Sequence, residues 1–174
     1  MESIATALMA LAHCEARLFM AKPERISVAN LFEEVLPPLA NKAREKELDI
    51  ALDLPKDACW FTDATALRSI VSNLVTNAID YSPSASAIRV QVGKNGSGEQ
   101  LLIANKNSNL TPEDIPHLFE RFWRKDAARS SPLHSGLGLA LASAYARSLG
   151  MKLTAALNRT EIIFTLSDLP ACHG

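Results

Sequence analysis

Cysteine is scarce in this chain of 174 residues, and the spacing of its cysteines excludes two common kinds of small domain. Cys14, Cys59 and Cys172 lie far apart, with no CxxC pair and no histidine at ligand spacing. Zinc modules and disulfide-rich secreted domains both need cysteines that recur at short intervals. We therefore expect neither a zinc site nor a disulfide framework, and a reducing cytoplasm is the simplest compartment.

An excess of charge of one sign and a long apolar run are lacking as well. The formal net charge is -1, so no overall basic field would attract nucleic acid or an anionic membrane surface. Residues 4–19 form the most apolar early stretch, but His13, Glu15 and Arg17 make it too polar to span a bilayer. No signal-peptide cleavage pattern is present. Any binding must come from a local site, and we expect any membrane part of a parent protein to lie outside this chain.

The chain does contain enough apolar residues for the core of one globular domain, since 48% are hydrophobic and 21% charged. Apolar residues at helical spacing predict a helix over residues 3–20. Its apolar stripe consists of Ile4, Leu8, Leu11 and Leu18. A second helix is predicted over residues 27–43 from a Ser27 cap, with Pro37-Pro38 bending or splitting it. The clearest helix covers residues 63–81.

Alternating apolar and polar residues predict strands elsewhere. Residues 48–54 and 59–62 are interpreted as one strand pair, joined by a turn at residues 55–57. The remaining predicted elements are a hairpin of residues 88–92 and 100–104, a helix of residues 138–149, and a closing hairpin of residues 152–157 and 161–166. Residues 105–135 are polar and irregular apart from a helical turn at 112–118, and such a long loop is usually functional or disordered.

A polar stripe runs along the helix predicted over residues 63–81. Asn73, Asn77, Asp80 and Tyr81 sit at positions i, i+4, i+7 and i+8, opposite the apolar face. A solvated helix face explains this stripe equally well, because asparagine is a poor helix former that surfaces tolerate. The stripe alone therefore does not establish a site.

Two further segments could carry chemistry. Residues 135–142, SGLGLALA, place two glycines at the start of a helix, whose free amide groups can meet a phosphate. A tight loop explains the same glycine pair. Phe119 and Phe122 lie between this segment and the polar stripe, and would ordinarily form one face of a helical turn packed on the core.

The order and spacing of these three segments resemble one protein family. LRSIVSNLVTNAIDYSP resembles the N box of bacterial sensor histidine kinases, PEDIPHLFERFWRKD their F box, and SGLGLALA their second glycine box. With the strand order, the resemblance covers residues 24–168. It implies an α/β fold of the gyrase, heat-shock-ninety, histidine kinase and MutL superfamily: a two-layer sandwich of a mixed β-sheet covered on one face by helices, with an extra N-terminal helix. Residues 1–22 would be a remnant of the second helix of the dimerisation hairpin, and residues 23–174 the catalytic ATP-binding domain.

The resemblance also implies ATP and Mg²⁺ as cofactors, with Asn77 as metal ligand, because an amide oxygen suits a hard cation that bridges phosphates. The implied ATP-binding residues are Asn73, Asn77, Asp80, Tyr81, Asn105, Asn107, Leu110, Phe119, Phe122, Ser135, Gly136, Leu137, Gly138 and Leu139. Arg121, Arg124 and Lys125 are candidates for phosphate or interdomain contacts, although exposed arginines are as often solubilising. Residues 123–135 would form the lid.

Two positions depart from the family pattern. The first glycine box of the family aligns with residues 105–110, which contain no glycine. Asn105 could still accept the exocyclic amine of adenine through its amide oxygen, and Asn107 tolerates left-handed backbone angles better than most residues. Asp80 stands where the family usually has lysine or arginine. Its carboxylate would repel a triphosphate unless it turns to solvent or contacts the metal.

The expected function is that of a two-component sensor histidine kinase domain, which transfers the γ-phosphoryl group of ATP to a histidine on a dimerisation hairpin outside this chain. A response regulator would be an indirect partner. His13 is a weak candidate for the acceptor, because the acidic residue and downstream proline of the family's acceptor pattern are missing. The alternative is a degenerate domain that serves as a non-catalytic adaptor or regulator, which Asp80 and the missing glycines favour.

Hydrolysis of ATP is not expected, because Asn73 stands where the hydrolytic members of the superfamily place a water-activating glutamate. The expected location is the cytoplasm, with the parent protein at the inner membrane. The apolar stripe of the N-terminal helix is short, so it predicts only a weak homodimer.

Overall fold

A mixed five-stranded sheet is the main element of the computed structural model, which describes residues 4–95, 98–107, 109–125 and 135–172. Its strand order is β2-β4-β5-β7-β6. The strands are Asp49–Asp53 (β2), Ala87–Asn95 (β4), Gly98–Lys106 (β5), Lys152–Asn158 (β6) and Glu161–Leu169 (β7). β2 runs parallel to β4, and the other neighbours are antiparallel. Both predicted hairpins, β4-β5 and β6-β7, are confirmed.

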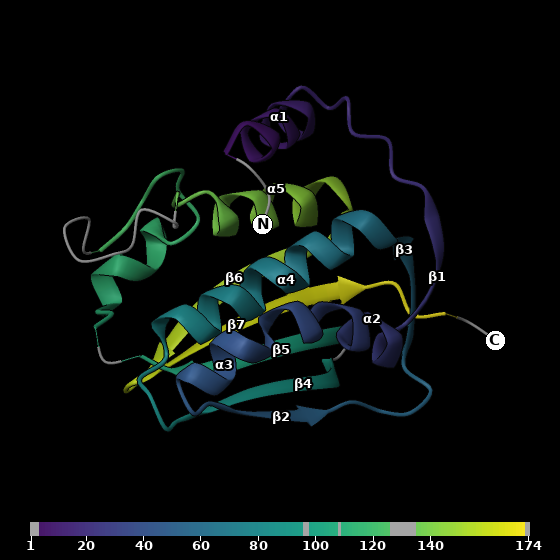
Figure 1. Cartoon of the computed structure of the whole chain (residues 1–174). Coiled ribbons are helices and arrows are strands. Elements are labelled where there is room, and N and C mark those ends of the chain that lie inside the picture. The colour runs from purple at the N-terminus through teal and green to yellow at the C-terminus, as the bar shows by residue number, and fades with distance from the viewer. Residues whose placement is uncertain (1–3, 96–97, 108, 126–134, 173–174) are drawn as a thin grey trace.

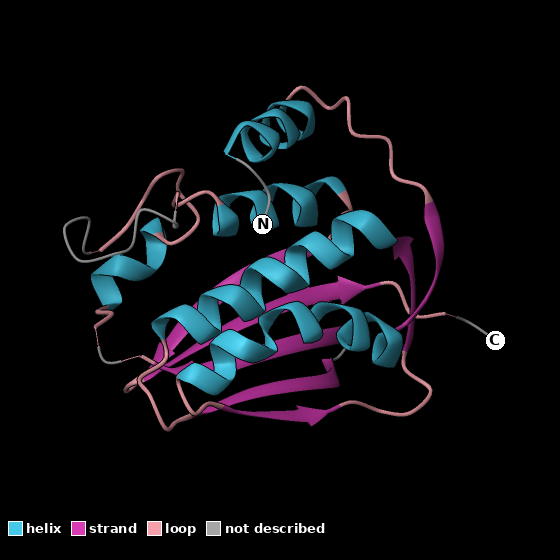
Figure 2. Cartoon of the chain, viewed as in Figure 1, coloured by secondary structure: helices cyan, strands magenta, loops and turns pink. Residues whose placement is uncertain are grey.

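Helices cover one face of this sheet (Figures 1 and 2). The helical elements are Ile4–Glu15 (α1), Val28–Val35 (α2), Pro37–Leu39 (η1), Ala40–Glu45 (α3), Ala64–Tyr81 (α4), Pro112–His117 (η2) and Gly138–Ser148 (α5). The predicted two-layer α/β sandwich with an extra N-terminal helix is therefore confirmed. Among the described residues, no helix has the length and apolarity needed to cross a membrane.

The core lies between the sheet and the apolar face of α4. The buried residues of α4 are Ala66, Leu67, Ile70, Val71, Leu74, Val75, Ala78 and Ile79. On the sheet, Ile103 and Phe164 are cross-strand neighbours, and each is at most 1% exposed. Asp63 caps α4, because its carboxylate accepts a hydrogen bond from the Ala66 amide at 2.9 Å. This packing fixes the orientation of α4 and hence of its polar stripe.

The helix predicted over residues 27–43 is split at its two prolines. Ser27 caps α2, its hydroxyl accepting a hydrogen bond from the Asn30 amide at 3.4 Å. Proline lacks an N–H group and clashes with the preceding turn, so the chain passes through η1 before α3 begins. The split allows α3 to lie beside the C-terminal end of α4, where Lys42 and the C-cap residue Lys46 contact α4.

The prediction that residues 48–54 and 59–62 pair with each other is wrong. β2 joins the five-stranded sheet beside β4, whereas β3 (Cys59–Asp63) pairs antiparallel with β1 (Pro23–Ser27) in a separate two-stranded sheet. The sequence prediction had no strand at β1. Local alternation indicates that a segment is extended, but partners far along the chain decide the pairing.

The expectation of no disulfide is also wrong, because Cys59 and Cys172 are bonded across a sequence separation of 113. The C-terminal segment returns to β3, where the Phe61 amide donates to the Pro170 carbonyl and the Cys172 amide to the Cys59 carbonyl, each at 2.8 Å. Spacing along the sequence could not reveal this proximity. The disulfide lies near the C-terminus, at the end of the molecule where α4 begins (Figure 1).

Replacing Cys172 with Ser is expected to lower the free energy of unfolding by about 2–5 kcal/mol, because the disulfide closes a long loop in the unfolded chain. Urea unfolding of both proteins with and without dithiothreitol measures this effect. The reductant should lower the midpoint of the unaltered chain and leave that of Cys172→Ser unchanged. Equal midpoints for all four samples would show that the disulfide does not contribute.

The N-terminal helix is shorter than predicted, and its apolar stripe is divided. α1 ends two residues before Arg17, which adopts a left-handed φ of 54°. Leu11 is 2% exposed because it packs against α5, whereas Ile4 and Leu8 are 54% and 38% exposed. Leu18 lies beyond the helix. The predicted single stripe of four residues is therefore wrong in composition, since Leu11 already makes an intramolecular contact.

Candidate functional site

Three segments that the sequence singled out meet at one end of the sandwich. The C-terminal end of α4, the segment that follows β5 and the N-terminal end of α5 all lie on the left in Figure 1. This end is opposite the disulfide and the C-terminus. Residues 126–134, which contain most of the predicted lid, lie outside the described residues.

Asn73 of α4 and Gly138 of α5 are in direct contact. A Cβ atom at Gly138 would lie 2.7 Å from Oδ1 of Asn73, closer than a side chain can approach. The amide nitrogen of Asn73 donates to the Ser69 carbonyl at 2.9 Å, which directs Oδ1 toward the glycine. The polar stripe and the glycine-rich segment are therefore packed together, as the family resemblance implied.

Gly136 makes an equivalent contact with the segment that contains Phe119 and Phe122, here called the phenylalanine segment. The amide of Phe122 donates to the Gly136 carbonyl at 2.9 Å, and both residues adopt left-handed φ angles, 61° and 69°. A Cβ atom at Gly136 would lie 2.8 Å from the Cα atom of Phe122. Because the obstacle is backbone, only glycine fits here. The Phe122 side chain is 58% exposed, so its role in packing on the core was overestimated.

Asn105 is fully buried on β5, with one amide atom unpaired. Its cross-strand partners are Ile88 and Ile162, both buried, so its side chain lies on the helix-covered face of the sheet. Nδ2 donates to the Lys106 carbonyl at 2.9 Å, but Oδ1 accepts no hydrogen bond from any described residue. An unpaired buried acceptor is costly, and a bound donor would relieve that cost.

Asn107 shapes the loop after β5 without a left-handed angle. Its side-chain oxygen accepts hydrogen bonds from the amides of Asn109 and Leu110 at 3.0 and 3.1 Å. The backbone amide of Asn107 donates to the Thr160 carbonyl at 2.7 Å. A side-chain turn therefore replaces the glycines of the family pattern at this position.

Several other predicted contact residues are used in packing. Leu110 and Leu139 pack against the main core, and Phe119 forms an edge contact with Phe164, with ring centroids 6.4 Å apart. Leu137 is 1% exposed in the contact between α1 and α5. Ser135 is half-buried. The side chains of these leucines and of Phe119 are thus used in packing.

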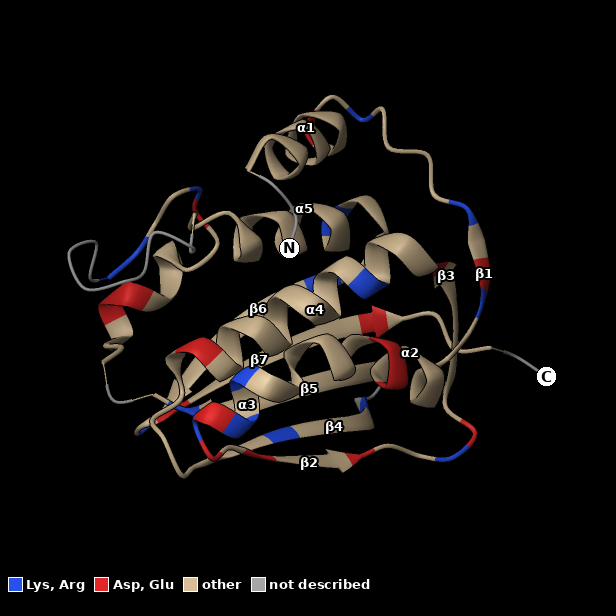
Figure 3. Ribbon diagram, viewed as in Figure 1, with Lys and Arg blue, Asp and Glu red and all other residues tan. Residues whose placement is uncertain are grey.

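Asp80 neither turns to solvent nor stands alone. Its side chain is 6% exposed and forms an ion pair with Lys42 of α3. Figure 3 shows this adjacency of basic segments of α3 and an acidic segment at the end of α4. Next to it, burial raises the pKa of the Tyr81 hydroxyl, with Arg124 lowering it and Asp80 raising it. Tyr81 therefore stays a neutral hydrogen-bonding group at physiological pH.

The three predicted basic contacts have different environments. Arg121 forms an ion pair with Glu15 of α1, and Lys125 forms one with Asp114 of η2. Arg124 is half-buried and close enough to Tyr81 to influence its pKa. Only Arg124 of these three therefore lies beside the end of α4, while Arg121 connects the F-box segment to the N-terminal helix.

Sequence reasoning missed Lys42 of α3 and Lys46, the C-cap of α3, which both lie against this end of α4. Lys42 pairs with Asp80, and Lys46 donates to carbonyl oxygens of the last turn. The only signal in the sequence is their i, i+4 spacing, which places both on one helix face. No sequence pattern near these lysines indicates that they contact Ile79 and Asp80, which lie more than thirty positions further along the chain.

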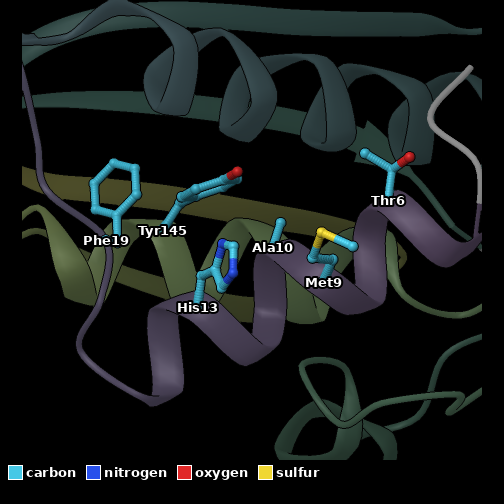
Figure 4. A pocket seen from close by; sticks show the side chains of 6 residues that line it. All are labelled: Thr6, Met9, Ala10, His13, Phe19 and Tyr145. Atoms are coloured by element: carbon cyan, nitrogen blue, oxygen red, sulfur yellow. The ribbon is translucent and has the colours of Figure 1, made fainter.

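A surface pocket of about 190 Å³ lies elsewhere, between α1 and α5 (Figure 4). It is lined by Thr6, Met9, Ala10, His13, Phe19 and Tyr145. Phe19 and Tyr145 form an edge contact, with ring centroids 5.4 Å apart. None of the predicted nucleotide-contact residues lines it. The pocket is therefore separate from the place where the three motifs meet.

Residues 62–170 match the protein family described as "Histidine kinase-, DNA gyrase B-, and HSP90-like ATPase". The matched range contains every contact described above between α4, β5, the phenylalanine segment and α5. The chain belongs to this family. It is a catalytic domain of the histidine kinase type, because its curated relatives include sensor-like histidine kinases.

Two relatives illustrate the similarity. The swarming motility regulation sensor protein RssA of Serratia marcescens is 30% identical over 98% of this chain and 36% of its own length. The sensor-like histidine kinase SenX3 of Mycobacterium tuberculosis is 32% identical over 67% of this chain and 28% of its own length. The chain thus spans about a third of the curated relatives that it matches.

The fold of this kinase-type domain is found in solved structures. Full-length ShkA in complex with AMPPNP superposes with a TM-score of 0.77 and 20% identity over 97% of this chain and 35% of that one. At this level of identity the likeness establishes the fold alone. The expected recognition and fold class are both confirmed by these comparisons.

Proposed function

We propose that this domain binds Mg-ATP at the end of α4 and passes the γ-phosphoryl group to a histidine on a dimerisation hairpin of the parent kinase. The observation that carries the proposal is the convergence of three motifs through Asn73, Gly138, Gly136 and Phe122. Positioning and charge stabilisation, rather than covalent chemistry, are what such a site supplies to phosphoryl transfer.

The adenine end of the site is proposed to lie at Asn105. Its buried Oδ1 lacks a donor among the described residues, and the exocyclic amine of adenine is such a donor. This pairing would replace the aspartate contact of the family pattern. The AMPPNP held by the kinase-fold neighbour ShkA is consistent with a nucleotide at this fold.

The metal is proposed to bind at Asn77. Its side chain is half-buried and makes no hydrogen bond with the described residues, so its amide oxygen is available as a ligand. The described residues contain no group of three or more acidic, histidine or cysteine side chains that could hold a metal ion. Mg²⁺ would therefore take its other ligands from phosphate oxygens and water, which suits an ion that dehydrates reluctantly.

Hydrolysis of bound ATP is not part of the proposal. Asn73 holds its amide nitrogen on the Ser69 carbonyl and its oxygen against Gly138, and an amide cannot take a proton from water. The γ-phosphoryl group would therefore await an acceptor histidine.

The parent protein is proposed to be a two-component sensor kinase at the inner membrane, with this domain in the cytoplasm and a response regulator as indirect partner. Residues 1–22 would be the end of the dimerisation hairpin, and residues 23–174 the catalytic domain. The packing of α1 on α5 and the ion pair between Glu15 and Arg121 support a direct connection between the two parts. A weak homodimer through α1 would use exposed Ile4 and Leu8.

Replacing Asn77 with Ala is expected to remove the metal-dependent part of nucleotide affinity, on the order of tenfold, because one oxygen ligand of Mg²⁺ is lost. Calorimetric titration with ATP, with and without Mg²⁺, measures this. Asn30→Ala on the exposed surface of α2 is the matched control and should behave as the unaltered chain. Equal affinity of the unaltered chain with and without Mg²⁺, or no binding, would favour the adaptor function instead.

A further inference from the structure

α3 and the residue that caps its C-terminus contribute two lysines to the C-terminal end of α4, at positions four apart in the sequence. Lys42 forms an ion pair with the carboxylate of Asp80. The Lys46 ammonium group donates three hydrogen bonds to backbone carbonyls: to Ile79 at 2.8 Å, Asp80 at 2.6 Å and Ser82 at 3.1 Å. One lysine thus holds a side chain of the last turn of α4, and the other holds its backbone.

The end of a helix needs such partners. The last carbonyl groups have no amide to accept from within the helix, and they carry the negative end of the helix dipole. The hydroxyl of Ser82 donates a hydrogen bond to the Ala78 carbonyl. The Lys46 ammonium group donates to the next two carbonyls, those of Ile79 and Asp80. Burial lowers the pKa of Lys46, while Asp80 nearby opposes that shift. Through its three hydrogen bonds, the Lys46 ammonium group caps the C-terminal turn of α4.

Asp80 needs a cation for a different reason. Its side chain is 6% exposed, so its charge is poorly screened by water. It follows Asn77 by one helical turn and precedes Tyr81, so an unbalanced carboxylate here would repel an anionic ligand at the same end of α4. The Lys42 ammonium group balances that charge through its ion pair with Asp80.

We propose that Lys42 and Lys46 are positioning residues of the nucleotide site, Lys42 by neutralising Asp80 and Lys46 by fixing the last turn of α4. This inference rests on the proposed function, because it assigns a role in binding Mg-ATP. Neither lysine is taken to touch the nucleotide. α3, which the prolines of η1 turn toward α4, is then part of the binding machinery rather than a connecting segment.

The test is a double-mutant cycle on Mg-ATP affinity. Lys42→Met should weaken binding roughly five- to tenfold, because one negative charge near the phosphates is unmasked. Asp80→Asn alone should bind at least as tightly as the unaltered chain. In the Asp80→Asn background, Lys42→Met should change the affinity less than about twofold. A lysine that contacted the phosphates directly would lose the same factor in both backgrounds.

Lys46→Met is the second arm of the test, because it leaves three carbonyls without their donor. Nucleotide affinity should fall roughly tenfold, and the loss should persist in the Asp80→Asn background because Lys46 acts through the backbone. Arg68→Met is the matched control. Arg68, on the first half of α4, forms an exposed ion pair with Glu34 of α2. Breaking this ion pair should leave the nucleotide affinity unchanged.

The outcomes separate this inference from the proposed function. If the unaltered chain binds Mg-ATP and both Lys42→Met and Lys46→Met bind equally well, the inference is overturned while the function stands. If Lys42→Met loses the same factor with Asp80 and with Asn at position 80, its action through Asp80 is overturned. If the unaltered chain binds no Mg-ATP, the proposed function fails and the inference fails with it.

Discussion

Gly136→Ala is expected to weaken nucleotide binding at least tenfold, because the added Cβ atom has no room beside the Phe122 backbone. A left-handed φ of 69° costs a residue with a Cβ atom about 1–2 kcal/mol. The added Cβ atom would also meet the Phe122 backbone at 2.8 Å, and a backbone cannot rotate away as a side chain can. The loop must move, which separates the phenylalanine segment from the start of α5.

Calorimetric titration with Mg-ATP measures the effect, and circular dichroism shows whether the fold is intact. Gly93→Ala is the matched control, because a Cβ atom there meets nothing within 4 Å. Gly93 lies on β4, away from the meeting point of the motifs. If folded Gly136→Ala bound Mg-ATP within about twofold of the Gly93→Ala control, the contact between Gly136 and Phe122 would have no part in the site.

Local patterns in the sequence predicted the elements that local chemistry determines. α4 was clear because its buried residues repeat at helical spacing after an aspartate cap, and the hairpins were clear because β4 with β5, and β6 with β7, are adjacent in sequence. The interruption at Pro37-Pro38 was predicted because a proline inside a helix lacks the N–H group for the backbone hydrogen bond and its ring clashes with the preceding turn.

Long-range pairing was not predictable in this way. β3 pairs with β1, and the C-terminal segment returns to β3 to bring Cys172 beside Cys59, yet nothing near either cysteine in the sequence indicates the other. The same limit hid the pairing of Lys42 with Asp80. A sequence pattern shows which face of a helix is polar, but not which distant helix supplies its counter-charge.

The candidate site was found because a family resemblance supplies long-range information that periodicity lacks. The contact of Asn73 with Gly138 joins helices separated by two strands and a long loop, and only the combined motifs predicted it. Resemblance was less useful where the chain departs from the pattern. At Asn107, a side-chain turn takes the place of the family's glycines, and at Asp80 a lysine from α3 restores the charge balance.

The chain alone is expected to incorporate no phosphoryl group and to turn over almost no ATP, yet to phosphorylate a cognate dimerisation hairpin supplied in trans. The acceptor pattern of the family is missing from the sequence, so the γ-phosphoryl group has no internal destination. Asn73 offers water no base, since its amide is held by the Ser69 carbonyl and Gly138. Bound ATP should therefore persist until a histidine is presented to it.

His13 is the residue that could contradict this expectation. It is exposed on α1 and lines the pocket with Phe19 and Tyr145, alongside α5 rather than at the site where the motifs meet (Figure 4). α1 packs against α5 through Leu11, and Glu15 forms an ion pair with Arg121 of the segment that follows η2. An intramolecular transfer would require α1 to leave this position, at the cost of re-exposing that apolar contact.

Incubation with γ-labelled ATP, with and without the hairpin, decides the matter. Acid-labile label should appear on the hairpin and remain at background on the chain, and the Asn77→Ala variant should label neither because the metal is lost. His117→Ala is the control for replacing an exposed histidine other than His13. His117, the last residue of η2, contacts Glu120 at the surface. Acid-labile label on the chain without any hairpin, retained in His117→Ala and lost in His13→Ala, would make His13 the acceptor.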